Sequence, residues 1–235
     1  MKYSEKKVFI SGTSTGLGHE LATYFLGEGA AVIGCSRTSP TINNSNYSHY
    51  SVDVSNAEQI KDMFRDIKRT FKNISILINN AGVGSSNLTI LEQPETLESV
   101  INTNILGPLL LSREAIRIMR KGDNPRIINI GSILSVIKPK GGVVYATSKS
   151  ALHTQTACLA KELANLSITC NLIGLNVFES NMSKNLRDAF VEEVLSSQSI
   201  KRFSKIEDII NVIDFFCSPK SNLITGQAVF LGGIS

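Results

Sequence analysis

The chain contains the stretch Ser11-Gly12-Thr13-Ser14-Thr15-Gly16-Leu17-Gly18, which separates a short apolar run from a segment with helical periodicity. The run Val8-Phe9-Ile10 is typical of a buried strand, and Leu17, Leu21 and Phe25 recur at the spacing of one helix face. Glycines let the backbone turn tightly and approach a phosphate, and a helix N-terminus offers unpaired N–H groups. The stretch therefore predicts a strand, a phosphate-binding turn and a helix, with an ordinary tight turn as the alternative.

The same alternation of strand-like and helix-like patterns continues along the whole chain. Further strands are predicted at residues 31–35, up to Val52, and at 74–78, 126–130, 168–173 and 227–231. Helices are predicted at residues 16–28, 55–71, 95–121, 145–164 and 204–216, the second and last opening on the capping-box spacings Ser55-x-x-Glu58 and Ser204-x-x-Glu207. Such alternation implies an α/β fold: a doubly wound, Rossmann-like parallel sheet of about seven strands with helices on both faces.

Length and composition indicate one globular domain and exclude several classes of function. The 235 residues suit a single domain spanning 1–235, and the hydrophobic share of 42% is ample for a core. A net charge of +4 is too small to indicate nucleic-acid binding. The four cysteines and three histidines form no metal-ligand pattern. Without a signal-type or membrane-length apolar run, we expect a cytoplasmic protein that does not engage a membrane.

Several motifs, taken in order along the whole chain, resemble those of the short-chain dehydrogenase/reductase family. The glycine stretch is similar to its TGxxxGxG cofactor motif, with Ser11 in place of Thr. Asn79-Asn80-Ala81-Gly82 is similar to its NNAG motif, and Asn104-Ile105-Leu106-Gly107 to its NxxG motif. Ser132, Tyr145 and Lys149 occupy the places of its catalytic Ser and YxxxK. Much of the chain resembles the bacterial 3-oxoacyl-carrier-protein reductases of this family.

The candidate catalytic residues are Asn104, Ser132, Tyr145 and Lys149. Tyr145 and Lys149 are four residues apart on a predicted helix and share one face, while Ser132 ends a predicted strand. A lysine cation nearby would lower the pKa of Tyr145 from about 10 toward about 7 and make it a general acid or base. The resemblance implies that Ser132 steadies the substrate oxygen, Lys149 also holds the ribose, and Asn104 anchors a proton-relaying water. Taken singly, each residue also has a purely structural explanation.

The resemblance implies a nicotinamide cofactor and no metal. Ser36 and Arg37 follow the second strand, where enzymes that use NAD usually place Asp or Glu. Because Arg37 can bind a 2′-phosphate, the sequence favours NADP(H), with NAD(H) possible. Cofactor contacts are expected from Gly12, Ser14, Thr15, Gly16, Leu17, Gly18, Ser36, Arg37, Asp53, Val54, Asn80, Ala81, Gly82, Tyr145, Lys149, Phe178 and Ser180.

The substrate pocket is predicted to be lined by residues 133–144 and 181–199, with residues 176–205 as a candidate lid. Apolar side chains there, with Lys138 and Lys140 nearby, suit an anionic or phosphate-tagged carbonyl compound. After the sixth strand the family usually has Pro-Gly, but this chain has Leu175-Asn176, and Asn tolerates a left-handed bend.

The leading functional hypothesis is an NADP-dependent oxidoreductase acting on a small-molecule carbonyl or secondary alcohol. The alternatives are a 3-oxoacyl-thioester reductase, an NAD-dependent sugar or alcohol dehydrogenase, and a non-catalytic dinucleotide-binding module. Asp123 and Leu166 stand where we would match basic residues of the carrier-protein reductases, which argues against a carrier-protein substrate. The small and apolar residues of segment 145–164 predict a homodimer or homotetramer.

Overall fold

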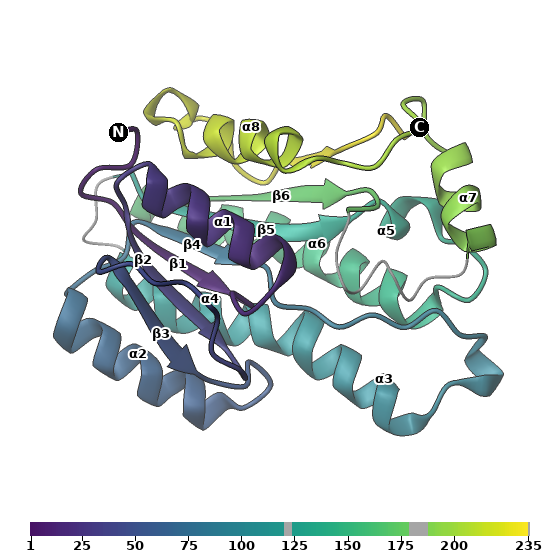
Figure 1. The fold of residues 1–235 in the computed structure, drawn as a ribbon, viewed down its shortest axis with the longest axis horizontal. Helices are drawn as coiled ribbons and strands as arrows, with labels where there is room; N and C mark the ends of the chain where they lie inside the picture. Colours follow the sequence, from purple (N-terminus) through teal and green to yellow (C-terminus); the bar gives the residue numbers. More distant parts are fainter. Residues whose placement is uncertain (120–123, 179–187, 235) are drawn as a thin grey trace.

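Seven strands form one sheet in the order β3-β2-β1-β4-β5-β6-β7, and every neighbouring pair is parallel (Figure 1). The structure is a computed structural model that describes residues 1–119, 124–178 and 188–234. The strands are β1 (Lys7–Ser11), β2 (Ala31–Ser36), β3 (Tyr47–Ser51), β4 (Ile76–Asn79), β5 (Arg126–Ser132), β6 (Thr169–Leu175) and β7 (Ala228–Phe230). The predicted doubly wound sheet of about seven strands is confirmed.

Helices cover both faces of the sheet (Figure 1). They are α1 (Gly16–Gly27), α2 (Ala57–Phe71), α3 (Pro94–Ile101), α4 (Gly107–Met119), α5 (Leu134–Ile137), α6 (Val143–Leu163), α7 (Asp188–Ser196) and α8 (Ile206–Cys217), with short helical turns at Thr89–Leu91, Asn102–Leu106, Ala164–Leu166 and Pro219–Ser221. Helices α1 and α8 pack on one face, and α2, α4 and α6 pack on the other. Helix α7 lies beyond the C-terminal ends of the central strands (Figure 1).

The alternation of side chains along β1 explains why its run of apolar residues is continuous. Val8 and Ile10 pack with α1 and α8, whereas Phe9 packs on the opposite face with α2 and α4. All three are fully buried, as expected for a parallel strand covered on both faces. Each strand therefore contributes to two separate apolar layers, which fix the helices at the sheet.

Three local features differ from the sequence-based expectations. The cap of α2 is Asn56, whose side chain accepts from the N–H groups of Glu58 and Gln59, whereas Ser55 donates to Asp53. The carboxylate of Asp208 accepts from Lys205 N at the start of α8, one residue beyond the predicted box at Ser204. The predicted helix 95–121 is divided, because a π-turn at Asn102–Leu106 separates α3 from α4.

A buried row of polar side chains connects the sheet to the two helices that flank the site. Asn79 Nδ2 on β4 donates to Asn129 Oδ1 on β5 at 2.8 Å and to Ser112 Oγ on α4 at 3.1 Å. Asn129 Nδ2 in turn donates to Thr156 Oγ1 on α6 at 2.8 Å. Buried polar groups are costly unless paired, so this row allows one arrangement of α4 and α6 over β4 and β5.

Among residues 1–119, 124–178 and 188–234, the structure contains no helix with the length and apolar character needed to cross a membrane.

Replacement of Asn129 by Leu should destabilise the fold by about 2–4 kcal/mol, because the amide of Asn79 and the hydroxyl of Thr156 each lose a buried partner. Urea unfolding monitored by circular dichroism measures this change. Asn43→Leu, in an exposed loop, serves as the matched control and should change the unfolding free energy by less than about 0.5 kcal/mol. Equal effects of the two substitutions would contradict the role of the polar row.

Candidate active site

A cleft of about 730 Å³ opens at the C-terminal ends of the strands, where the strand order reverses between β1 and β4. It extends from the glycine loop and the end of β2, past the residues that follow β4, to the end of β5 and the first turns of α6. Ligands of doubly wound sheets bind at such a reversal point. The sheet topology therefore places the predicted motifs of the chain around one cavity.

The glycine loop forms a tight cradle at one end of the cleft. Gly12 and Gly16 have positive φ angles of 77° and 59°, which disfavour any residue with a side chain. A Cβ atom on Gly18 would lie 2.1 Å from the carbonyl oxygen of Gly12, so α1 can approach the loop only with glycine there. Thr15, the N-cap of α1, makes no capping hydrogen bond through its side chain, and the first turn contains no acidic residue.

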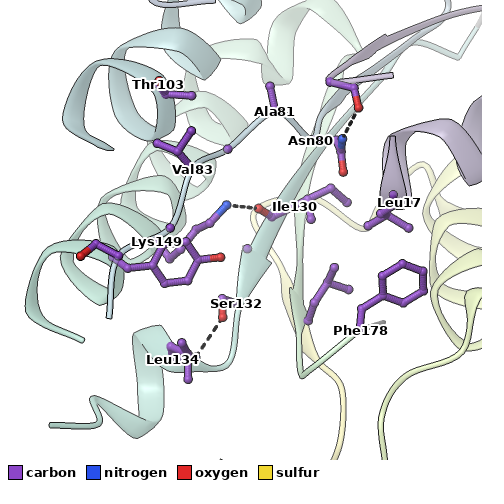
Figure 2. A pocket seen from close by; sticks show the side chains of 18 of the residues that line it. Leu17, Asn80, Ala81, Val83, Thr103, Ile130, Ser132, Leu134, Lys149 and Phe178 are labelled. Atoms are coloured by element: carbon purple, nitrogen blue, oxygen red, sulfur yellow. Dashed lines mark hydrogen bonds between the residues drawn. The ribbon is translucent and has the colours of Figure 1, made fainter. Parts of the chain in front are cut away.

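Ser11 and Asn80 connect this loop to the segment that follows β4. The hydroxyl of Ser11 accepts from the backbone N–H groups of Asn80 and Ala81, both at 3.0 Å. The side-chain amide of Asn80 donates to the carbonyl of Ser11 at 2.9 Å (Figure 2). A hydroxyl is what these contacts require, which explains why serine can stand where the family has threonine.

Ser132, Tyr145 and Lys149 meet in the cleft, as the sequence predicted. The side chains of Ser132 and Tyr145 line the same cavity, and Ser132 Oγ accepts from the N–H of Leu134 at 3.2 Å (Figure 2). Lys149 Nζ donates to the carbonyl of Ile130 at 2.9 Å and lies 5.7 Å from the centre of the Tyr145 ring. Strand β5 and helix α6 thus bring together residues that are 13 or more positions apart in the sequence.

Burial sets the protonation of this pair in a way that the sequence argument did not anticipate. It raises the pKa of Tyr145 to about 12, against the smaller lowering effect of its hydrogen bond with Ser132. It also lowers the pKa of Lys149 to about 8, because the amine is almost fully enclosed. The expected lowering of the tyrosine pKa toward 7 is therefore wrong for the chain's own residues, which keep Tyr145 protonated at neutral pH.

Asn104 lies behind the cleft rather than in it. Its side chain is 1% exposed and pairs with both backbone groups of Val83, accepting from the N–H and donating to the carbonyl at 2.9 Å each. Its amide also donates to Ser148 Oγ on α6 at 3.0 Å. The π-turn at Asn102–Leu106 carries Asn104. The residue therefore connects the segment after β4 to α6, and its predicted role in anchoring a water stays a prediction.

Most of the residues predicted to contact a cofactor line the cleft. These are Gly12, Ser14, Thr15, Gly16, Leu17, Ser36, Arg37, Asp53, Val54, Asn80, Ala81, Gly82, Tyr145, Lys149 and Phe178. Gly18 is buried and touches the loop from within α1. Ser180 lies outside the residues that the structure describes.

At the end of β2, Arg37 offers an exposed cation to the cleft. The hydroxyl of its neighbour Ser36 donates to the carbonyl of Thr38 at 2.8 Å and lies 2.9 Å from His49 Nε2. Across this end of the cleft, hydrogen bonds from the Ser55 side chain and backbone lower the pKa of Asp53, with a smaller contribution from the charge of Arg37. Asp53 is therefore an anion, and Arg37 is the cation that can bind a phosphate here.

The opposite end of the cleft has one polar and one apolar wall. Residues 84–87 and Glu92 contribute the polar wall, which the sequence argument missed. Val177, Phe190 and Val194 contribute the apolar wall, of which the last two fall in the predicted segment 181–199. Of the predicted segment 133–144, Ile133 and Leu134 line the cleft, whereas Lys138 and Lys140 are exposed elsewhere. The two lysines are therefore not part of the described cleft.

Asn176, which replaces the usual glycine after β6, acts through its side chain. It does not adopt the positive φ that we expected of it. Its amide instead donates to the Gln198 side chain at 2.9 Å and to the Arg202 carbonyl at 2.8 Å, and its oxygen accepts from Ser204 N at 3.1 Å. These bonds close the two ends of the candidate lid onto each other. Whether the segment moves as a lid stays a prediction.

Within the described ranges, no three His, Cys, Asp or Glu side chains gather closely enough to hold a metal ion.

Comparisons with known proteins found relatives that are similar over nearly the whole chain. A family model described as short chain dehydrogenase matches residues 6–190. The 3-oxoacyl-acyl-carrier-protein reductase of Buchnera aphidicola is 33% identical over 99% of this chain and 98% of its own length. A short-chain dehydrogenase from Leptospira borgpetersenii, solved with NAD⁺, is 27% identical with a TM-score of 0.88, covering 98% of this chain and 92% of its own. ElxO, solved with NADP, is 26% identical with a TM-score of 0.86, covering 96% of each chain.

The buried amine of Lys149 predicts a specific dependence of stability on pH. Between about pH 8 and pH 10.5 the unfolded chain keeps the proton on this lysine while the folded chain releases it, so stability should rise with pH there. Relative to Lys149→Met, the wild type should gain up to about 1.4 kcal/mol per pH unit. Urea unfolding of both proteins from pH 7 to pH 10 measures the difference. Lys161→Met, on the exposed face of the same helix, should show no such slope, and a pH-independent difference for Lys149 would refute the argument.

Proposed function

The chain belongs to the short-chain dehydrogenase family of oxidoreductases, and on this premise we propose that it transfers a hydride between NADP(H) and a carbonyl or secondary alcohol. The observation that carries the proposal is the meeting of Ser132, Tyr145 and Lys149 in the same cleft as the glycine loop. A binding module has no need of a buried lysine beside a tyrosine, because burial of the amine is costly. The geometry therefore favours an enzyme over a non-catalytic dinucleotide-binding protein.

The described residues fit a dinucleotide. A Cβ at Gly12 would lie 3.0 Å from Ala81 Cα, so the loop keeps its backbone open to the cleft only as glycine. The uncapped first turn of α1 offers N–H groups to a pyrophosphate. Arg37, at the far end of the cleft, could bind a 2′-phosphate. The structure of ElxO with NADP also favours this cofactor, whereas the Leptospira relative was solved with NAD⁺. We therefore favour NADP(H), with NAD(H) as the alternative.

The chain's own residues supply proton transfer and positioning. When bound, the nicotinamide would supply or accept the hydride. Tyr145, protonated at neutral pH, would donate its proton to the carbonyl oxygen in the direction of reduction. Ser132 Oγ, held by Leu134 N, keeps its own proton available for the same oxygen. Lys149 is held close to Tyr145 by the carbonyl of Ile130 and can pass a proton to it.

Reduction of a 3-oxoacyl thioester is the second candidate function. It is supported by the identity to the Buchnera reductase, which extends over 99% of this chain. Against a carrier-protein substrate, Leu166 is not basic and does not line the described cleft, while Asp123 lies outside the described residues. We therefore rank it behind a free small-molecule substrate.

We also propose that the chain forms a homodimer or homotetramer. Exposed apolar side chains are found at Ile101, Leu106 and Leu109 around the π-turn, and at Val143 on α6. Apolar patches of this kind are typical of interfaces between protein chains. No membrane or nucleic-acid partner enters the proposal.

Replacement of Tyr145 by Phe should lower kcat/KM for carbonyl reduction by roughly 10²–10⁴-fold, because the general acid is removed. Binding of NADPH, measured by fluorescence titration, should remain within a few fold of the wild type. Tyr50→Phe, on β3 and outside the described cleft, controls for loss of a tyrosine hydroxyl. Turnover that survives in Tyr145→Phe would overturn the catalytic assignment.

Replacement of Arg37 by Ala should reduce the preference for NADPH over NADH by about tenfold to a hundredfold. A charge-assisted hydrogen bond contributes roughly 1.5–3 kcal/mol, and 1.4 kcal/mol corresponds to a factor of ten. Dissociation constants of both cofactors measure the effect directly. Arg65→Ala, on the exposed face of α2, should leave the ratio unchanged, and an unchanged ratio in Arg37→Ala would remove the argument for NADP(H).

A further inference from the structure

The substrate end of the cleft is chemically asymmetric. On one side lie Val177, Phe190 and Val194, which belong to a small apolar cluster of their own. On the other side lie Ser85, Ser86, Asn87 and Glu92, all of which line the same cavity as Tyr145 and Ser132. A substrate held at this end can therefore contact apolar groups as well as hydrogen-bonding groups.

Glu92 is the centre of the polar wall. Its carboxylate accepts from the hydroxyl of Ser85 on one oxygen and from the amide of Asn87, at 3.4 Å, on the other. A carboxylate has about four acceptor positions, so these two contacts orient Glu92 and leave capacity for further donors. The side chain is half-buried and borders the cavity, where a ligand can supply such donors.

The backbone around this wall places it next to the catalytic helix. A Cβ atom at Gly141 would lie 3.5 Å from the carbonyl oxygen of Ser86 and 3.6 Å from Asn87, so these two loops are in contact. Gly141 lies two residues before the first residue of α6 (Val143–Leu163) and four before Tyr145. The segment that contains Ser86 and Asn87 therefore contacts the loop that leads into α6, and Glu92 lines the same cavity as Tyr145.

The described charge at the substrate end of the cleft is that of Glu92. Among the described lining residues, Arg37 and Lys149 are the cations, and the first lies at the opposite end while the second is buried beneath Tyr145. The substrate end thus presents a carboxylate and no further described cation. A carboxylate or phosphate on the substrate would be repelled by Glu92, whereas hydroxyl groups could donate to Glu92 and exchange hydrogen bonds with Ser85, Ser86 and Asn87.

We propose that Glu92 is a specificity-determining residue that selects a neutral, polyhydroxylated carbonyl or alcohol substrate, such as a sugar or a polyol, by accepting hydrogen bonds from its hydroxyl groups. The C–H face of such a compound fits the apolar wall, and its hydroxyl groups fit the polar one. This inference rests on the proposed function, and it differs from the anionic or phosphate-tagged substrate expected from the sequence, which stays a prediction.

The test compares wild type, Glu92→Gln and Glu95→Gln on four substrates of similar size: a polyol, an apolar secondary alcohol, an amino alcohol and a hydroxy acid. Glu95 is an exposed carboxylate in the first turn of α3 and does not line the cleft, so it is the matched control. We expect the wild type to prefer the polyol. Glu92→Gln should lower kcat/KM for the polyol by about tenfold to a hundredfold, mainly through KM.

In the same variant, kcat/KM for the apolar alcohol should stay within about twofold, and turnover of the hydroxy acid should rise as the repulsion is removed. An equal loss on all four substrates would show a merely structural role and overturn the inference. Preference of the wild type for the amino alcohol or the hydroxy acid would overturn it as well, whether or not the variant folds. Absence of turnover with every substrate would instead defeat the proposed function, and this inference with it.

Discussion

The reversal of strand order between β1 and β4 is the constraint on which the cleft depends. After β1 and after β4 the chain leaves toward opposite faces of the sheet. The backbone groups at the C-terminal ends of these two strands therefore cannot continue the hydrogen bonds that pair the strands. The hydroxyl of Ser11 takes over, accepting from the N–H groups of Asn80 and Ala81, while the Asn80 amide returns a bond to Ser11. One polar pair thus fixes the spacing of the two walls between which a dinucleotide can lie.

Burial of Lys149 brings its amine into contact with the segment that follows β4. Its amine lies close to Gly82, where a Cβ atom would be 3.6 Å from Lys149 Nζ and 3.3 Å from Asn104 Oδ1. A side chain at the final glycine of Asn79-Asn80-Ala81-Gly82 would meet the lysine at an ordinary contact distance but would crowd the asparagine that holds Val83. A motif that reads as cofactor binding in the sequence also has a packing function toward the catalytic helix. This coupling explains why the two motifs occur together.

The sequence predicted the sheet and the meeting of Ser132, Tyr145 and Lys149 well because both depend on local patterns. Apolar runs identify buried strands, and a helix brings residues four apart, such as Tyr145 and Lys149, onto one face. Features that depend on tertiary contacts were missed. The π-turn around Asn104 interrupts a continuous helical pattern, and its side-chain bonds to Val83 show what holds it. Similarly, nothing in the pattern distinguishes the cap at Asn56 from the neighbouring Ser55, since both can accept from the following N–H groups.

The small net charge of the chain does not indicate which ligand the protein binds, whereas the positions of individual charges in the cleft are informative. Among the described residues that line it, one cation, Arg37, stands at the cofactor end, and the other, Lys149, is enclosed next to Tyr145. We assign Arg37 to cofactor binding and Lys149 to proton transfer, and both steps are the same for every substrate of the family. Discrimination between substrates must then come from the walls beyond Tyr145, where Glu92 is the charged group that the structure describes. Because Glu92 lies on a loop and the proposed catalytic residues lie on β5 and α6, substrate choice can differ between relatives without any change in the chemistry.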